Sequence, residues 1–375
     1  MTPAREPSLL PALPPLFLLV ASLLPAGAND AAFGGSAANP YPIHTKEIRM
    51  VSEDITIRSD AKNGAWLYTC DFVFENLSED PITILMGMPL LSMSEGDEDF
   101  ISTHPSDEQA LPAGTPMVWN FTTTVDGRSV PVTEGKPITK NIGKFPGFRT
   151  AYTWPMHFAG RSSKARSIRN TYKPGRVPGP KRRNHAIRRV RNTYKLGYNY
   201  SLGDTFLDYI LVTGGLWHDG RIGRSRLRVI LDDPSYVLPK KDKHRDFVSS
   251  AGTIKPAGYK VTGVDGKIVI EWDLRNFAPK EDLEVVFRSR EHFIRDHAKT
   301  LKGAGPRKLR NFPYAAHGYP FKDQDLRDYF ATLLYSSGNT AFKESDLSDH
   351  SREMIAEAKH QEAEAKYRAW HSLNE

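Results

Sequence analysis

The run from Trp66 to Phe74 alternates between apolar and polar residues, and this alternation constrains the fold more than any other feature of the 375-residue chain. In an extended strand, successive side chains point to opposite faces of a sheet. The apolar positions therefore share one face, and they are Trp66, Tyr68, Cys70, Phe72 and Phe74. Such a face must be covered by a second layer, so the pattern predicts a packed β structure with Cys70 as a small core residue.

Strand-like runs continue through the region from about residue 46 to residue 288. They are Ile82–Met86, Val118–Val125, Arg226–Leu231, Tyr259–Val264, Lys267–Trp272 and Leu283–Phe287. Asp126-Gly127 and Asp265-Gly266 lie between such runs and are typical of hairpin turns. We therefore predict an antiparallel β-sandwich of one or two sheet pairs over residues 29–290. Only residues 204–211 have the pattern of a short helix, which disfavours a βαβ enzyme fold.

The periodicity becomes helical near the C-terminus. An apolar stripe with the spacing of one helix face is formed by Leu326, Tyr329, Phe330, Leu333 and Leu334. Asp323 is placed to cap the start of that helix, and a last helix is predicted from about residue 345 to residue 373. The sequence thus predicts a basic, partly helical linker over residues 291–305 and a small all-α domain over residues 306–375.

The first 28 residues have the pattern of an export leader. Residues 9–24 carry no charge, and Ala26-Gly27-Ala28 supplies the small-residue cleavage pattern. The apolar stretch is short for a bilayer span, so we predict a signal peptide cleaved near Ala28; a retained membrane anchor is the alternative. No later run approaches 18 apolar residues, so the processed chain is expected to be exported, periplasmic or extracellular, without a transmembrane span.

The positive net charge is concentrated in one segment. Residues 161–195 hold 13 of the 51 Lys and Arg residues and no Asp or Glu. The rest of the chain has 38 Lys and Arg residues and 44 Asp and Glu residues, so it carries a small net negative charge. This basic insert is predicted to attract anionic envelope polymers or lipids, unless it is a charged loop without a dedicated partner. The candidate polyanion-contacting residues are Lys181, Arg182, Arg183, Arg188, Arg189 and Arg191. Nucleic-acid binding by the insert would require the leader to remain uncleaved, so it is not the favoured prediction.

The sequence from Leu309 to Phe321 reads L-R-N-F-P-Y-A-A-H-G-Y-P-F, and it resembles the signature of the YARHG domain over about residues 306–358. The resemblance implies an exported bacterial protein that binds an extracellular component. The arginine of the signature is replaced by Ala316 in this chain. The candidate binding residues on this motif are Tyr314, His317, Gly318, Tyr319 and Phe321. Gly318 suits a helix-ending turn, and His317 has two interpretations, a structural histidine or a binding residue.

Residues 29–290 resemble a second family of exported bacterial proteins, known only as a domain of unknown function. The matching segments are Met50–Ile57, Phe72–Asn76, Met86–Leu90, Tyr209–Trp217 and Asp282-Leu283. This resemblance implies an envelope-associated β protein and no particular activity.

Motifs for catalysis, metals and cofactors are missing from the sequence. It contains no H-E-x-x-H, G-x-S-x-G, P-loop or C-x-x-C motif, and His292 and His297 stand five apart, which separates them on a helix. We therefore predict no catalytic residue, no metal and no cofactor. The leading hypothesis is a non-catalytic binding or scaffolding protein of the cell envelope, whose partner is an anionic polymer, a lipid or a protein. The alternative is an envelope hydrolase in which His157, His218 or His317 acts as a base.

Overall fold

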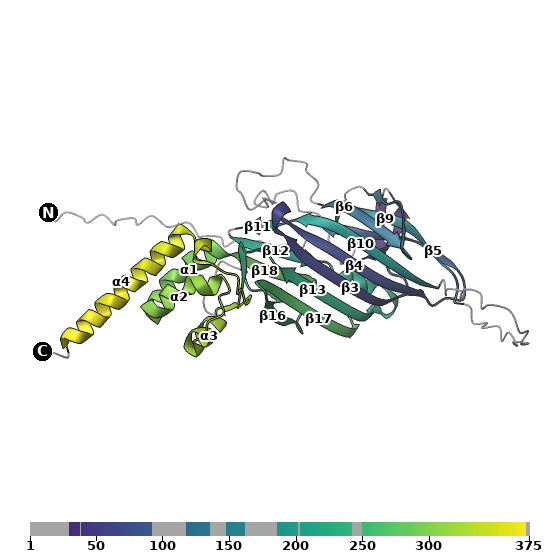
Figure 1. The fold of residues 1–375 in the computed structure, drawn as a ribbon. Helices are drawn as coiled ribbons and strands as arrows, with labels where there is room; N and C mark the ends of the chain where they lie inside the picture. Colours follow the sequence, from purple (N-terminus) through teal and green to yellow (C-terminus); the bar gives the residue numbers. More distant parts are fainter. Residues whose placement is uncertain are drawn as a thin grey trace, which may run out of the picture.

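The computed structural model describes residues 30–37, 39–91, 118–135, 148–161, 186–201, 203–241 and 250–372. The strands gather in one part of the molecule and the four α-helices at its other end, so the described chain is elongated (Figure 1). The predicted leader lies outside these residues. Within the described chain, no helix has the length and apolar character needed to cross a membrane.

The largest sheet has eight strands. In spatial order they are β16 (Lys260–Val264), β17 (Lys267–Phe277), β13 (Ile222–Leu231), β3 (Ile48–Asp60), β4 (Ala65–Asn76), β10 (Ile187–Gly197), β6 (Val118–Val125) and β7 (Arg128–Ser129). Strands β3 and β13 pair in parallel, and the other neighbours are antiparallel. The sheet is therefore mixed, whereas the sequence predicted antiparallel pairing alone.

Two smaller sheets complete the β region. One contains, in spatial order, β2 (Asn39–Ile43), β1 (Ala31–Ser36), β5 (Ile82–Leu91), β9 (Phe148–Phe158) and β8 (Thr133–Glu134). The other contains β11 (Asn199–Ser201), β12 (Asp204–Tyr209), β18 (Leu283–Ser289), β14 (Tyr236–Pro239) and β19 (Leu334–Tyr335), with β15 (Ile254–Lys255) paired to β18.

One face of the large sheet covers both smaller sheets. The rings of Phe121 on β6 and Tyr152 on β9 stack with their centroids 4.5 Å apart. The rings of Tyr68 on β4 and Tyr209 on β12 lie 6.2 Å apart. The five alternating apolar residues of β4, Cys70 among them, are all buried in this core. The predicted β-sandwich region is therefore confirmed.

The C-terminal part is helical, as predicted. It contains α1 (Arg290–Leu301), α2 (Pro306–Ala316), α3 (Gln324–Ala331) and α4 (Asp349–Ser372). Short 3₁₀ turns occur at η1 (Ala61–Asn63), η2 (Val212–Leu216), η3 (His218–Gly220), η4 (Lys302–Ala304) and η5 (Glu344–Asp346). Phe293, Phe312 and Phe330 form a second hydrophobic core among the helices. Asp323 caps α3 by accepting a hydrogen bond from the Leu326 N–H over 3.0 Å.

Both Asp-Gly pairs form the predicted turns. Asp126 and Gly127 have φ of 51° and 79°, and Asp265 and Gly266 have φ of 50° and 78°. Two successive positive φ angles are those of a type I′ hairpin turn, for which Asp-Gly is a preferred sequence. These turns join β6 to β7 and β16 to β17.

The prediction of a short helix at residues 204–211 is wrong. It contains strand β12, and all six residues of that strand are buried. Because both faces of β12 are covered, the alternation that marks a half-buried strand is missing. Residues 291–305, predicted as a partly helical linker, contain most of α1 and the 3₁₀ turn η4.

The end of the predicted basic insert belongs to the large sheet. Residues 187–197 form β10, which lies between β4 and β6. Its buried side chains alternate with exposed or half-buried ones, so Arg189 and Arg191 project from the outer face, whereas Arg188 lies on the same side as Val190 and donates to the His157 carbonyl on β9. Residues 162–185, with Lys181, Arg182 and Arg183, lie outside the described residues.

Candidate functional site

The Tyr314–Phe321 turn ends helix α2. The Gly318 N–H donates to the carbonyl of Ala315 over 2.9 Å, and the Tyr319 N–H donates to the carbonyl of Tyr314 over 3.0 Å. With Gly318 at φ 76°, this pair of bonds is a Schellman motif, the helix ending expected for this glycine. A Cβ atom at Gly318 would lie 1.9 Å from Oγ of Ser337, so the turn also packs tightly against the chain after β19.

His317 is buried beneath the turn, with 4% of its surface exposed. A nitrogen of the Arg290 guanidinium lies 2.8 Å from Nδ1 of His317. Because a guanidinium only donates hydrogen bonds, Nδ1 accepts, and the neutral imidazole carries its proton on Nε2. Burial and the positive charge of Arg290 lower the pKa of His317 to about 4, so the ring is neutral near pH 7.

Arg290 joins the β region to the helical domain at this point. It is the first residue of α1 and directly follows β18. Burial lowers the pKa of Arg290 to about 10, which still leaves it charged near pH 7. Nε of Arg290 and Nε2 of His317 are buried and have no hydrogen-bond partner among the described residues. The pair holds the two parts of the chain together, and this contact fits the structural interpretation of His317.

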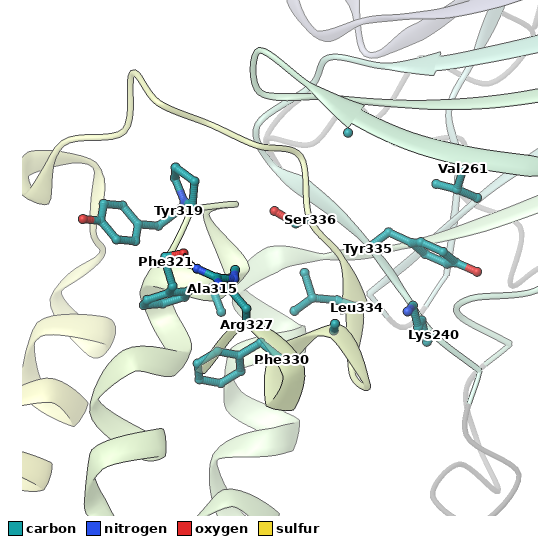
Figure 2. A pocket seen from close by; sticks show the side chains of 13 residues that line it. Lys240, Val261, Ala315, Tyr319, Phe321, Arg327, Phe330, Leu334, Tyr335 and Ser336 are labelled. Atoms are coloured by element: carbon teal, nitrogen blue, oxygen red, sulfur yellow. Dashed lines mark hydrogen bonds between the residues drawn. The ribbon is translucent and has the colours of Figure 1, made fainter. Parts of the chain in front are cut away.

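A cavity of about 400 Å³ lies between the helical domain and the β region. We call it the interdomain pocket, and it is lined by Lys240, Val261, Gly263, Ala315, Tyr319, Pro320, Phe321, Arg327, Phe330, Ala331, Leu334, Tyr335 and Ser336. Figure 2 shows Phe321 and Phe330 beside Arg327 on the helical side, with Tyr335 and Lys240 opposite them. Two candidate binding residues of the sequence, Tyr319 and Phe321, therefore line this pocket.

Strand pairing and backbone contacts fix the two walls of the interdomain pocket. Strand β19 adds to the edge of β14, with Leu238 opposite Tyr335. The Lys240 N–H donates to the carbonyl of Leu333 over 2.8 Å. A Cβ atom at Gly263 would lie 1.8 Å from the carbonyl oxygen of Ser336, so only glycine allows β16 to approach this segment so closely.

The charged residues that line the interdomain pocket are all basic. Among its described lining residues, Lys240 and Arg327 are basic and none is acidic. The Lys240 ammonium lies 4.9 Å from the centre of the Tyr335 ring. Arg327 donates to the backbone carbonyls of Phe321 and Lys322, at 2.9 Å and 2.5 Å. In the part of the chain that the structure describes, neither cation makes an ion pair with a carboxylate.

Three of the predicted site residues do not line the interdomain pocket. Tyr314 points elsewhere, since its hydroxyl donates to Oε1 of Glu344 over 2.9 Å. His317 and Gly318 lie on the other side of the Leu334–Ser337 segment and line a smaller cavity with Arg290. His317 and Arg290 also line a third cavity beside Asp346, so the motif contributes to three neighbouring cavities.

Two of the three arginines of β10 have acidic partners, one on β4 and one in the β6–β7 turn. Arg191 makes two hydrogen bonds to the carboxylate of Asp71, at 2.6 Å and 2.9 Å. Arg188 lies 2.7 Å from Asp126. Arg189 is exposed, and no ion pair of its side chain occurs among the described residues. The charges of Arg188 and Arg191 are thus largely matched within the sheet.

The histidines of the hydrolase alternative lie apart from the interdomain pocket. Nδ1 of His157 is 3.0 Å from the hydroxyl of Thr83 on the sheet surface. Nδ1 of His218 is 2.6 Å from the carbonyl of Lys46, and its Nε2 is 3.0 Å from the carboxylate of the adjacent Asp219. Across the described residues, no group of three or more His, Cys, Asp or Glu side chains has the arrangement of a metal site.

The C-terminal residues of the interdomain pocket are detectable from the sequence, and those of the β region are not. The YARHG resemblance points to Tyr319 and Phe321 through the spacing of its aromatic residues. Lys240 and Val261 come from β-region segments far from the motif, and nothing in their local sequence marks them. Only the docking of the helical domain on β14 and β16 brings them to the same cavity.

Both predicted family resemblances are confirmed. Residues 295–363 match the YARHG domain. Residues 28–141 match a domain of unknown function, DUF4424, which is the first part of the region where the sequence predicted such a family. The YARHG match begins within α1, earlier than the sequence predicted.

One solved structure resembles the chain along most of its length. It is the crystal structure of a candidate nutrient binding protein from Legionella pneumophila, with 26% identity and a TM-score of 0.55. The likeness covers 88% of this chain and all of the other. No curated protein matches the chain.

Two peptidase-like structures resemble it more weakly. A two-domain M1 zinc metallopeptidase variant bound to tryptophan has 11% identity and a TM-score of 0.29, over 68% of this chain and 45% of that chain. Yeast LTA4 hydrolase has 7% identity and a TM-score of 0.26, over 65% of this chain and 29% of that chain. Both superpose too poorly to bear on function.

Proposed function

We propose that this chain is an exported, non-catalytic binding protein of the cell envelope, and that its ligand occupies the interdomain pocket. The observation that carries the proposal is that the YARHG turn supplies Tyr319 and Phe321 to a cavity whose other wall is the β region. Cavities of this size between two structural units are common places for small ligands. The Legionella likeness supports a binding role in general terms, since that protein is described as a candidate for nutrient binding.

Export is supported by the leader pattern and by the position of the first strand. Strand β1 begins at Ala31, shortly after the predicted cleavage position at Ala28, and both Ala31 and Ala32 are fully buried. Fractionation of the native host followed by N-terminal sequencing tests this part. We expect a periplasmic or extracellular protein whose first residue is near Asn29. Recovery of the unprocessed chain from the cytoplasm would contradict the proposal.

Ligand binding in the interdomain pocket is tested by filling the cavity. Ala331 is an exposed lining residue at the end of α3, so Ala331→Trp is expected to fold and to occupy the pocket. Ala356 is exposed on α4 away from the pocket, which makes Ala356→Trp a matched control. Mass spectrometry of small molecules released from protein purified from the envelope is the measurement. We expect a molecule that accompanies the native chain and Ala356→Trp but not Ala331→Trp.

The same experiment has a clear contrary outcome. If the native chain and both variants release the same small molecules in the same amounts, the interdomain pocket is not the binding site. Circular dichroism of each variant checks that the fold is retained before the comparison.

We propose a second, electrostatic contact between the basic segment and anionic envelope lipids or polymers. The 13 cations at residues 161–195 support it; Lys181, Arg182 and Arg183 lie outside the described residues, and Arg189 is exposed. Polybasic segments bind anionic membranes with roughly 1 kcal/mol per cation near the surface, and salt weakens this attraction.

The electrostatic contact is tested without removing β10. A variant in which Lys181, Arg182 and Arg183 are changed to Gln keeps the length of the segment, whereas deletion of residues 187–195 would remove a central strand. Co-sedimentation with phosphatidylglycerol vesicles at low and moderate salt is the measurement. We expect weaker, less salt-sensitive binding by the variant; equal binding by the two proteins rules the contact out.

A further inference from the structure

The lining of the interdomain pocket indicates the chemistry of its ligand. Most of its wall is apolar, and the three aromatic rings of Tyr319, Phe321 and Phe330 lie on the helical side. Phe321 and Phe330 stack with their ring centroids 5.5 Å apart, and Tyr319 meets Phe321 edge-on at 5.1 Å. Such a wall gains free energy by covering apolar carbon atoms of a ligand.

The polar groups of the pocket select for negative charge. Lys240 lies on the β side and Arg327 on the helical side, and no described lining residue is acidic. A cationic ligand would therefore meet two like charges and no counter-charge. An anionic group would be attracted by both cations and would receive charge-assisted hydrogen bonds from them.

The donors of the two cations are only partly used. The Lys240 ammonium makes a cation–π contact with Tyr335 and no hydrogen bond within the described chain. Arg327 uses one terminal nitrogen for two backbone carbonyls and the other for Oε1 of Gln324, which leaves its Nε–H without a described partner. Lys240 is thus the principal donor, and Arg327 adds a fixed positive charge.

The volume of the pocket limits how much of a ligand it can enclose. A cavity of about 400 Å³ is near the lower end of the range for small-molecule sites and cannot enclose a polymer segment or a whole diacyl lipid. We propose that the interdomain pocket binds a small amphipathic monocarboxylate, with its apolar body against Phe321 and Phe330 and its carboxylate at Lys240. This inference rests on the proposed function, because it names the ligand class of the same pocket.

Four probes test separately whether the ligand needs an apolar chain and whether it needs a carboxylate. Octanoate has an apolar chain and a carboxylate, octanol lacks the charge, octylammonium reverses it, and acetate lacks the chain. Isothermal titration calorimetry of the full chain with each probe is the measurement. We expect octanoate to bind most tightly, octanol more weakly, and octylammonium and acetate not measurably.

Two variants assign the contacts. Lys240→Gln is expected to weaken octanoate binding about tenfold, the effect of one charge-assisted hydrogen bond, and to leave octanol binding unchanged. Lys308 serves as the matched control, because its ammonium also lies over a tyrosine ring, at 4.2 Å from Tyr329, but it does not line the pocket. Lys308→Gln is therefore expected to bind octanoate as the native chain does.

The outcomes distinguish the inference from the proposed function. If octanol or octylammonium binds as tightly as octanoate and Ala331→Trp abolishes that binding, the pocket is a ligand site but the monocarboxylate class is wrong. If Lys240→Gln leaves octanoate binding unchanged, the headgroup assignment is wrong. If no probe binds, or if Ala331→Trp leaves the binding of every probe intact, the monocarboxylate inference fails, and the release experiment alone decides whether the pocket is a binding site.

Discussion

His317 shows how one residue of a recognisable motif can have a structural role. Its Nδ1 accepts a hydrogen bond from Arg290, and its ring packs 4.8 Å from the ring of Phe342. Arg290 comes from the junction of β18 and α1, so the contact joins the YARHG turn to the β region. The motif identifies His317 in the sequence, but nothing there marks Arg290 as its partner, because that contact depends on how the helical domain docks.

The shifted pKa of His317 predicts a dependence of stability on pH. The pKa is about 4 in the folded chain, below the value of 6.5 expected on unfolding. Between these values the unfolded chain binds more protons, so stability falls as the pH drops from about 6.5 to about 4. The full loss is roughly 3 kcal/mol, reached below the folded pKa.

This dependence is measured by comparing the native chain with His317→Asn, which keeps an acceptor for Arg290 but cannot titrate. Urea unfolding at pH 7 and pH 4.5 is the measurement. We expect the native chain to lose more stability than the variant over this interval. An equal loss in the two proteins means that protonation of His317 does not contribute.

Among the elements, the strands with one covered face are the ones predictable from sequence. Strand β4 alternates because its outer face meets solvent, and the hairpin turns follow from Asp-Gly pairs. Strand β12 lacks alternation because it is buried on both sides. Strand β10 resembles part of an insert in the sequence, because the acidic partners of its arginines, Asp71 and Asp126, are distant along the chain.

The approach of β16 to the chain after β19 predicts a stability effect at Gly263. Gly263→Ala would place a Cβ atom 1.8 Å from the carbonyl oxygen of Ser336, so the two segments must separate. We expect a loss of roughly 1–3 kcal/mol, as for other forced overpacking. A Cβ atom at Gly215 would meet nothing within 4 Å, so Gly215→Ala is the control and is expected to change stability by less than about 0.5 kcal/mol.

Thermal and urea unfolding of Gly263→Ala and Gly215→Ala measure how much stability each variant loses. Similar stability of Gly263→Ala and Gly215→Ala would mean that the β16 hairpin moves aside without cost. In that case the contact does not hold the wall of the interdomain pocket.

At the scale of the whole molecule, two hydrophobic cores are joined by a small set of contacts. Val237 on β14 packs into the helical core, β19 pairs with β14, and Arg290 bonds His317. Because these contacts involve buried groups, we expect the two parts to unfold together. The sequence predicts both parts but not their docking, since the β14–β19 pairing joins two very short segments without a distinctive pattern.

Two spectroscopic probes test this coupling. Four of the tryptophans, Trp66, Trp154, Trp217 and Trp272, are buried in the β region, whereas far-UV circular dichroism at 222 nm reports mainly on the helices. We expect coincident urea transitions for the native chain and earlier loss of the helical signal in Gly263→Ala. Separate transitions in the native chain would show that the helical domain unfolds independently.

The short strand β19 also has a consequence for biogenesis. It covers Leu238 and Pro239 at the border of the six-stranded sheet, and it is supplied by a segment that is synthesised well after β14. Until that segment arrives, the outer backbone groups of β14 remain open to strand addition by a neighbouring nascent chain. Truncation before residue 334 is therefore expected to yield an aggregation-prone product, and a chaperone would act most usefully before β19 is in place.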